Sequence, residues 1–307
     1  MTTSTVKKKE EATTTTKRLL LLGGPTGIGK TAFAIQLAQK LQTEIINADS
    51  RQFYREMRIG TARPTEDELA QAPHHFVAQL SVETPYTVVD FENDALAKLE
   101  QLFEKHDTVI ATGGSGLFLE ALAYGLDPLP EADPKLRAEL EAQLEQEGVD
   151  ALAERLRGIN PSKAESIDLK NPRRLIRAIE ISLAGDAKPS LKKPRVFEVQ
   201  AYYLNTDREL LYNRINQRVE LMMEAGLLEE VKSLLNHRNL NALSTVGYKE
   251  LFDYLDTKLS LEEAVEQIKQ HSRNYAKRQL TWFRNRGNYQ EITPGDKSLA
   301  LVLQNLQ

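Results

Sequence analysis

The feature that most constrains this chain is the segment Gly24 to Thr31, which fits the pattern G-x-x-x-x-G-K-[ST]. The apolar run Leu19 to Leu22 before it predicts a buried strand, and the amphipathic stretch Thr31 to Leu41 after it predicts a helix. A glycine-rich loop in that setting can fold its backbone N–H groups around phosphate oxygens, at the positive end of the helix dipole. The predicted phosphate-binding residues are Gly24, Pro25, Thr26, Gly27, Ile28, Gly29, Lys30 and Thr31, with Lys30 as a point charge and Thr31 as a ligand for Mg²⁺.

Three further short runs indicate the rest of a sheet. Glu44 to Asn47 and Thr108 to Thr112 have the length and composition of buried strands, and Val196 to Leu204 indicates a strand that returns to the sheet. Helical patterns separate these runs, and such alternation is typical of a parallel sheet. We therefore predict an α/β fold: a P-loop NTPase-like parallel sheet with helices on both faces and a helical insertion domain.

The ends of the predicted strands locate a candidate site. In an open parallel sheet, ligands bind beyond the carboxyl ends of the strands. The loop from Gly24 to Thr31, the segment Asp49 to Gln52 and the segment Gly113 to Gly116 each follow a predicted strand. We therefore expect these three segments to converge on one crevice.

The middle of the chain changes character. From about Asp127 the sequence consists of proline-punctuated helical stretches with charged faces. We predict a helical insertion at residues 128–195, inside a core domain made of residues 17–127 and 196–307. Residues 1–16, rich in threonine, lysine and glutamate, cannot bury apolar surface and are predicted to be a disordered tail.

Composition excludes some classes of protein. The chain has no cysteine, which rules out disulfides and thiolate metal sites. Its apolar runs fall short of the roughly 20 residues that a membrane-spanning helix needs, and its start lacks the apolar segment of a signal peptide. We therefore expect a cytoplasmic protein that makes no membrane contact, and we expect it to be a monomer.

The distribution of charge bears on a nucleic-acid partner. The net charge of −4 argues against one, but electrostatic attraction to nucleic acid is local. Between residues 170 and 195 only Glu180 and Asp186 oppose a basic run. That run is either a solvated helix with a lysine-rich loop or a surface for RNA. Its members are Lys170, Arg173, Arg174, Arg177, Lys188, Lys192, Lys193 and Arg195.

The phosphate-binding loop alone leaves the reaction open. Kinases, GTPases and ATPases all use such a loop, and a turn between a strand and a helix without function is the plainest alternative. A GTPase is disfavoured because the chain has no Asn-Lys-x-Asp run. A nucleotide kinase remains possible at this point.

Further motifs narrow the choice. The chain resembles the tRNA dimethylallyltransferase (isopentenyltransferase) family, bacterial type, over about residues 19–286. The resemblance rests on eight short runs in the order and spacing of that family. The runs are Ile46–Tyr54, Ile59–Pro64, Ala72–His75, Thr112–Phe118, Asp127–Pro130, Arg173–Glu180, Val246–Tyr248 and Lys277–Arg284.

The resemblance implies a reaction and its chemical groups. A dimethylallyl group would pass from dimethylallyl diphosphate, held in the phosphate-binding loop with Lys30, to the N6 amine of an adenine next to the anticodon of a tRNA, and diphosphate would leave. Asp49 matches the family's general base, Thr26 matches a threonine placed near the bridging oxygen of the diphosphate, and Arg218 matches an arginine that should pair with the departing diphosphate. Plainer roles remain for Asp49, as a helix cap or Mg²⁺ ligand, and for Arg218, as a surface salt bridge.

The resemblance also implies contacts with the tRNA anticodon stem-loop. A stacked adenine must be flipped out before its amine can react. The implied contact residues are Asp49, Ser50, Arg51, Gln52, Ser115, Arg137, Arg173, Arg174, Leu175, Ile176, Arg177, Ser244, Thr245, Val246, Gly247, Tyr248 and Lys249. Arg174 and Arg177 lie three apart and would share a helix face. Lys269, Arg273 and Lys277 lie four apart and either extend this surface or are simply exposed.

The chain departs from the family pattern at a few positions. Gly27-Ile28 replaces small residues, Ala78 stands where aspartate is common, and Ser115 replaces a threonine. We expect little effect, because none removes a residue assigned to chemistry. His74 and His75 are adjacent and would point apart, so we expect loop packing and no metal site.

Three competing functions remain at this stage. They are a small-molecule kinase that uses ATP, a transferase that prenylates free AMP, and a nucleic-acid-binding switch NTPase. The basic insertion favours tRNA over AMP.

Overall fold

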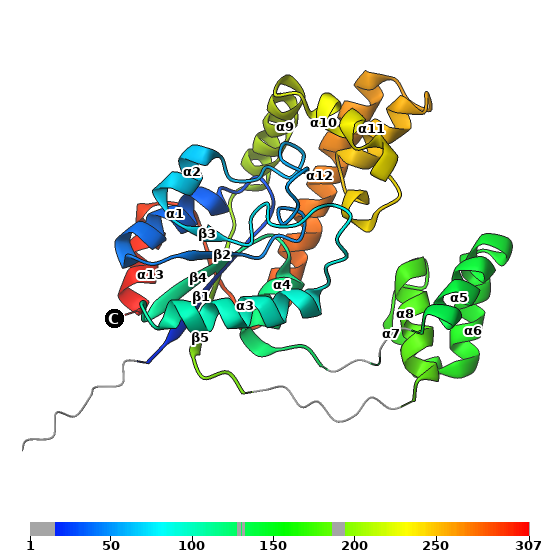
Figure 1. Cartoon of the computed structure of the whole chain (residues 1–307), viewed down its shortest axis with the longest axis horizontal. Helices are drawn as coiled ribbons and strands as arrows, with labels where there is room; N and C mark the ends of the chain where they lie inside the picture. Colours follow the sequence, from blue (N-terminus) through cyan, green and yellow to red (C-terminus); the bar gives the residue numbers. More distant parts are fainter. Residues whose placement is uncertain (1–15, 128–129, 131–132, 186–193, 307) are drawn as a thin grey trace, which may run out of the picture. The chain divides into compact units, whose positions relative to one another are not determined.

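A six-stranded sheet lies at the centre of the computed structural model, which describes residues 16–127, 130, 133–185 and 194–306 (Figure 1). The strands lie in the order β3-β2-β4-β1-β5-β6, and every neighbouring pair is parallel. The strands are β1 (Arg18–Gly23), β2 (Ile45–Asn47), β3 (His74–His75), β4 (Thr108–Thr112), β5 (Glu198–Leu204) and β6 (Gln290–Ile292).

Helices cover both faces of this sheet, and further helices lie beyond the carboxyl ends of its strands. They are α1 (Lys30–Leu41), α2 (Glu66–Gln71), α3 (Val88–Phe103), α4 (Gly116–Tyr124), α9 (Arg208–Glu224), α10 (Leu227–Ser233), α11 (Tyr248–Leu255), α12 (Leu261–Arg284) and α13 (Asp296–Asn305), with short 3₁₀ turns at Leu235–His237 and Asn241–Leu243. Within the described part of the chain, no helix is long and apolar enough to cross a membrane.

The leucines of β1 explain why the sheet is covered on both sides. Successive side chains of a strand point to opposite faces. Leu19 and Leu21 accordingly pack with α3 and α4, while Leu20 and Leu22 pack with α1, α9 and α13. All four are buried. A continuous apolar run is what a strand covered on both faces requires.

A third apolar cluster stabilises the region beyond the carboxyl ends of the strands. It joins the end of α9, helices α10 and α11, and the first half of α12, through buried side chains such as Val219, Leu227, Leu251 and Ile268. Met57, from the loop after β2, is buried in the same cluster. This cluster therefore forms a separate wall of the region where a ligand is expected.

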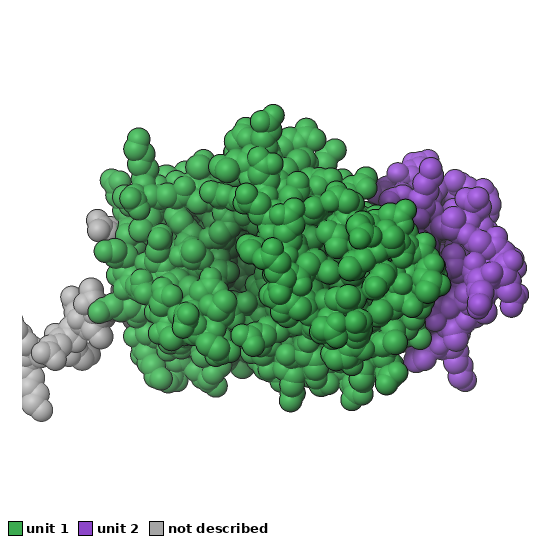
Figure 2. Space-filling model, turned by 90° about the horizontal axis from the view of Figure 1, so that it is seen from above, with its two compact units in different colours: residues 1–124, 195–307 green, residues 125–194 purple. Residues whose placement is uncertain are grey.

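Residues Gly125–Pro194 form a second compact unit, separate from the first unit of Met1–Tyr124 and Arg195–Gln307 (Figure 2). Its helices are α5 (Pro134–Glu147), α6 (Val149–Ile159), α7 (Pro161–Ser166) and α8 (Pro172–Leu183). Leu140, Leu152, Leu156 and Ile179 are fully buried in its core. The unit therefore has an apolar core of its own, and the predicted limits of 128 and 195 fall close to the observed ones.

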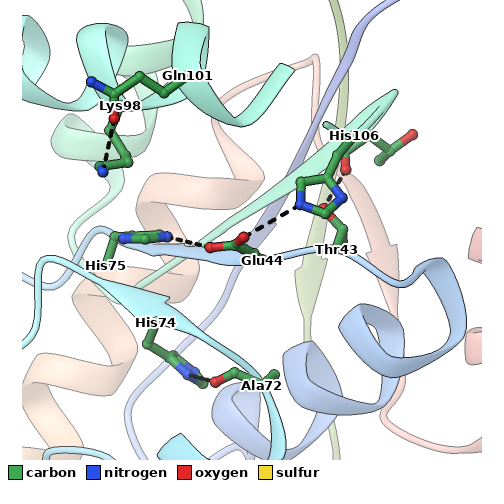
Figure 3. Close-up of polar contacts among 9 residues, drawn as sticks. Thr43, Glu44, Ala72, His74, His75, Lys98, Gln101 and His106 are labelled. Atoms are coloured by element: carbon green, nitrogen blue, oxygen red, sulfur yellow. Dashed lines mark hydrogen bonds and ion pairs between the residues drawn. The ribbon is translucent and has the colours of Figure 1, made fainter. Parts of the chain in front are cut away.

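At the amino ends of β2 and β4, a carboxylate binds two imidazoles (Figure 3). Glu44 is 2.7 Å from Nε2 of His75 and 3.4 Å from Nε2 of His106. His74 points elsewhere and contacts the carbonyl of Ala72 at 2.8 Å. In the described residues, no group of three His, Cys, Asp or Glu side chains could hold a metal ion. Glu44 therefore links the edge strand β3 to the segment before β4, at the end of the sheet away from the site.

The predicted fold class is confirmed, with local differences. The predicted strand from Val196 begins at Glu198, and the predicted strand from Glu44 begins at Ile45. The short strands β3 and β6 were not predicted, because two or three residues give no periodic pattern.

Candidate active site

Loops at the carboxyl ends of β1 and β2 border a cavity of about 590 Å³ within the first unit. Thr26 of the phosphate-binding loop and Asp49 after β2 both line it. Arg218 of α9 and the segment from Ser244 to Gly247 line other parts of the wall. The third predicted segment, Gly113 to Gly116, does not line the cavity and lies behind the Asp49 loop instead.

The phosphate-binding loop has the backbone geometry that its glycines allow. Gly27 and Gly29 adopt φ angles of 81° and 96°, a left-handed region that favours glycine. A Cβ on Gly27 would stand 2.9 Å from Cγ1 of Ile215, so the loop also approaches α9 closely. Ile28 is buried in the apolar core, which explains how a large residue fits here without contacting the cavity.

Lys30 begins α1 and turns back over the loop. Its Nζ donates a hydrogen bond to the carbonyl of Pro25 at 2.8 Å. Burial lowers the pKa of Lys30 to about 8; the negative charge of Asp49 opposes this shift and the positive charge of Arg218 adds to it. The lysine is therefore a desolvated cation that a bound anion would stabilise.

Arg218 faces the same loop from α9. Its guanidinium donates a hydrogen bond of 2.5 Å to Oγ1 of Thr26. Its Nε is buried and has no hydrogen-bond partner among the described residues. Burial lowers the pKa of Arg218, against the opposing effect of Asp49. The surface salt bridge that we considered for this residue is therefore wrong, and a buried donor without a partner indicates a place for an anion.

Asp49 occupies a turn directly after β2. Its Oδ1 accepts the backbone N–H of Arg51 at 3.1 Å, and its backbone carbonyl accepts the N–H of Gln52 at 3.1 Å. It therefore caps a turn, not a helix as one alternative held. Burial, with the charge of Asp49, raises the pKa of Tyr275 to about 12. Asp49 and Tyr275 both line the cavity.

The other residues of the Asp49 segment divide into two groups. Ser50 and Arg51 line the cavity. Ser115 supports them, because its Oγ accepts the Ser50 N–H at 3.3 Å. The Gln52 amide donates to the carbonyls of Thr61 and Ala62, both at 3.1 Å, and so holds the turn that follows. Gln52 therefore supports the wall of the cavity.

The segment Ser244 to Lys249 lines the cavity with one exception. Tyr248 is fully buried, and its hydroxyl donates to Glu230 at 2.7 Å. The predicted tRNA contact through the Tyr248 side chain is therefore wrong, since that side chain cannot reach a ligand. The cavity-lining residues of the segment are Ser244, Thr245, Val246, Gly247 and Lys249.

Glu230 holds the wall that Tyr248 supports. Its carboxylate accepts the backbone N–H groups of Arg58, Ile59 and Gly60 at 2.7–3.0 Å, in addition to the Tyr248 hydroxyl. Gly60 lines the cavity, and a Cβ there would stand 2.6 Å from the Tyr248 ring. The carboxylate of Glu230 therefore fixes two of the sequence runs, Ile59–Pro64 and Val246–Tyr248, against each other. Sequence analysis missed Glu230, because it lies in neither run.

The basic residues of the second unit have mixed surroundings. Arg137 makes two hydrogen bonds to the buried Glu180, at 2.7 and 2.8 Å, and Arg177 makes one at 3.0 Å. Arg177 also donates to the carbonyl of Pro130 at 2.7 Å. These two arginines stabilise the unit itself. Arg173 and Arg174 are exposed on α8.

Two predicted tRNA contacts in this unit need correction. Leu175 and Ile176 are 0% and 7% exposed and belong to the apolar core of the unit, so their side chains cannot contact RNA. Arg195 is likewise no part of a basic surface, because it binds Glu92 at 2.6 Å and the carbonyl of Ala121 at 2.7 Å. Asp186 and three lysines of the basic run (Lys188, Lys192 and Lys193) lie outside the described residues.

The basic stripe on α12 is partly neutralised. Lys269 binds Glu220 at 3.1 Å and Glu266 at 2.7 Å. Arg273 donates to the side-chain oxygen of Asn216 at 2.6 Å, and Lys277 is exposed. The stripe is therefore weaker as an RNA surface than its spacing indicated.

The fold and the cavity define a P-loop-like α/β protein whose site combines two half-buried cations, Lys30 and Arg218, with the carboxylate of Asp49. The model of the IPP transferase family matches residues 52–286, and the chain belongs to this family. It is 49% identical to the tRNA dimethylallyltransferase of Christiangramia forsetii over 267 residues, which are 85% of this chain and 88% of that protein. It is 44% identical to the tRNA dimethylallyltransferase of Flavobacterium johnsoniae over 299 residues, 92% of this chain and 96% of that protein.

Solved structures agree with this membership. The full-length tRNA isopentenylpyrophosphate transferase of Bacillus halodurans superposes with a TM-score of 0.70 at 36% identity, covering 94% of this chain and 95% of that one. A eukaryotic dimethylallyltransferase acting on tRNA gives a TM-score of 0.72 at 27% identity, covering 92% of this chain and 75% of that one.

The lowered pKa of Lys30 predicts a pH dependence. Between pH 8 and 10.5 the unfolded chain binds a proton at this residue that the folded protein does not bind. Burial of the charged Lys30 therefore lowers the free energy of unfolding below about pH 8, and this loss of stability is relieved as the pH rises toward 10.5. The affinity for an anion instead falls as the pH rises, because the neutral amine attracts the anion less.

We expect the affinity for inorganic diphosphate to fall between about pH 7.5 and 9.5 more steeply in the native protein than in Lys30→Met. Calorimetric titration of both proteins at each pH measures this, and the ionisation of diphosphate itself is common to the two series. Parallel pH profiles would show that Lys30 does not titrate in this range.

Proposed function

We propose that the protein transfers a dimethylallyl group from dimethylallyl diphosphate to the N6 amine of an adenine next to the anticodon in tRNA, releasing diphosphate. The observation that carries this proposal is the buried guanidinium of Arg218, which contacts Thr26 in the phosphate-binding loop and keeps a buried donor without a partner. The names of the related proteins support the same reaction.

The loop and its two cations suit a diphosphate leaving group. When the bond from the prenyl C1 to the bridging oxygen breaks, its electron pair and a negative charge pass to the diphosphate. Lys30 and Arg218 lie where they would neutralise that charge in a desolvated site, which lowers the energy of the transition state. The loop N–H groups at the start of α1 would contribute in the same direction.

We propose Mg²⁺ as the cofactor of this site. Thr31 follows Lys30 in the first turn of α1 and is half-buried, so its hydroxyl is suited to be the protein ligand of the ion. The described residues offer no carboxylate cluster that would hold a metal on its own. The oxygens of the diphosphate would therefore complete the coordination, and the ion would supply positive charge to the leaving group.

We propose Asp49 as the group that takes the proton. The lone pair of an adenine N6 amine is delocalised into the ring, so the amine is a weak nucleophile until a proton is removed. One oxygen of Asp49, Oδ1, is fixed by the Arg51 N–H. We propose that the other oxygen, Oδ2, accepts the N6 proton as the new N6–C1 bond forms.

The partner we propose is the anticodon stem-loop of a tRNA in the cytoplasm, bound by a monomer of the protein. Arg51, Lys249 and Arg278 line the cavity, as do the carboxylates of Asp49, Glu250 and Asp253. We propose that the basic side chains contact the phosphates of an RNA loop whose reactive base is turned inward. The exposed Arg173 and Arg174 of the second unit would contact the RNA backbone.

The proposed function has a direct test. The protein is incubated with dimethylallyl diphosphate and unmodified tRNA, and the nucleosides are then analysed by mass spectrometry. A dimethylallyl group on an adenosine next to the anticodon supports the proposal. Transfer of a phosphoryl group from ATP would contradict the proposal, and so would prenylation of free AMP while the tRNA stays unmodified.

Asp49→Asn tests the role of the base. The substitution keeps the shape of the side chain and removes its ability to take a proton. We expect kcat to fall about 10²- to 10⁴-fold, with the affinities for donor and tRNA changing only a few fold. Pre-steady-state turnover and equilibrium titrations measure the two effects, and near-normal turnover would exclude Asp49 as the base.

Arg174→Ala tests the second unit. We omit Arg177 from this variant because its loss would also leave the buried Glu180 with fewer partners. If Arg174 contacts one phosphate, the slope of log affinity for tRNA against log salt should decrease in magnitude by about 0.7–0.9. Arg157→Ala, an exposed arginine of α6 that pairs with Glu154, is the matched control and should leave the slope unchanged. Equal slopes for all three proteins would remove Arg174 from the RNA surface.

A further inference from the structure

Gln279 of α12 connects two loops of the active site. Its side chain is buried, with the residue only 5% exposed. Its Oε1 accepts the backbone N–H of Thr26 at 2.8 Å, and its Nε2 donates to the carbonyl of Gly114 at 2.9 Å. One side chain thus joins the loop after β1 to the loop after β4.

The chemistry of the two partners suits an amide. Thr26 offers an N–H donor and Gly114 offers a carbonyl acceptor, and an amide serves both at once without carrying charge, through an oxygen and a nitrogen that lie apart from each other. The fit is also tight, since a Cβ on Gly114 would stand 2.4 Å from Nε2 of Gln279. The same Cβ would lie 3.5 Å from Oδ2 of Asp49. The Gln279 amide and Oδ2 of Asp49 therefore both lie next to Gly114.

Thr26 carries this arrangement to the site of reaction. Its backbone N–H is held by Gln279, while its hydroxyl accepts the hydrogen bond from Arg218. A shift of the Thr26 backbone would displace that hydroxyl, and the buried guanidinium of Arg218 would then lose a partner. Gln279 does not line the cavity whereas Thr26 does, so Thr26 offers a direct route by which Gln279 can influence a ligand.

We propose that Gln279 is a positioning residue for the prenyl transfer. It fixes Thr26 so that the hydroxyl of Thr26 holds the Arg218 guanidinium toward the departing diphosphate. This inference rests on the proposed function for the identity of the leaving group. The geometry of the three residues is independent of it.

Helix α12 gives Gln279 a rigid base. His271 and Tyr275 precede it at intervals of four residues and so share its helix face. His271 binds the buried Glu250 at 2.5 Å, and Tyr275 forms a hydrogen bond with Ser115. The helix is therefore attached to Glu250, which lines the cavity, and to Ser115 in the loop after β4, and these contacts restrict movement of the Gln279 amide away from Thr26.

The test is a double-mutant cycle between Gln279→Met and Thr26→Val. Methionine keeps the length of the side chain without its hydrogen bonds, and valine removes the hydroxyl without changing the backbone N–H. We expect Gln279→Met to lower kcat about tenfold, with KM for the donor changing less than threefold. If Gln279 acts through the Thr26 hydroxyl, adding Gln279→Met to Thr26→Val lowers kcat by less than a further twofold.

Two controls separate positioning from loss of stability. Phe283→Leu alters another buried contact of α12, the one against Gly23, and should lower the melting temperature while leaving kcat unchanged. Gln279→Asn is too short to reach both loops, and it replaces Gln279→Met in the cycle if the methionine variant does not fold. The inference is overturned if the Gln279 variant keeps kcat within twofold of the native protein. It is also overturned if the fold reductions in kcat of the two single variants multiply in the double variant.

A failure of the proposed function gives a different result. In that case the native protein forms no prenylated nucleoside. The same four proteins titrated with inorganic diphosphate then test the inference alone. The inference is supported if the double variant loses less affinity than the product of the two single fold losses. It is overturned if the loss in the double variant equals that product.

Discussion

The structure depends on the contact between the guanidinium of Arg218 and the hydroxyl of Thr26, with the ammonium of Lys30 close by. Two cations are held in a place where burial lowers the pKa of both. Such an arrangement is unfavourable without an anion, and Asp49 opposes the pKa shift of each cation without providing a hydrogen bond to either among those the structure gives. In the proposed function, the diphosphate of the donor would supply negative charge at this place and a hydrogen-bond acceptor for Arg218 Nε.

The elements around this contact serve to keep it in place. Helix α9 brings Arg218 to the loop, and its own position is fixed by Ile215 against Gly27. Helix α12 contributes Gln279 behind Thr26. Glu230 fixes the opposite wall through backbone N–H groups. A preorganised site of this kind does not have to reorient its dipoles during the reaction, and this is a main source of catalytic power in enzymes.

The sequence predicted those features that local patterns determine. The loop between the first strand and the first helix, the positions of the main strands along the chain and the approach of Thr26, Asp49 and Arg218 to one cavity all follow from motif, periodicity and family resemblance. The sequence could not predict which side chains of a motif are buried in the core and which line the cavity. Leu175, Ile176 and Tyr248 stand in runs assigned to tRNA, yet tertiary packing buries them. Gln279 and Glu230 were missed for a related reason, because their roles depend on backbone groups far away in the sequence.

The central claim is that Lys30 and Arg218 together bind the diphosphate of the prenyl donor. A crystal structure of the protein with inorganic diphosphate tests it most directly. The account predicts diphosphate in the loop from Gly24 to Thr31, with the Lys30 ammonium moved from Pro25 to a phosphate oxygen and the Arg218 guanidinium within hydrogen-bond distance of the same ligand. Diphosphate bound elsewhere, or a loop in which Arg218 keeps only its contact with Thr26, would contradict the account.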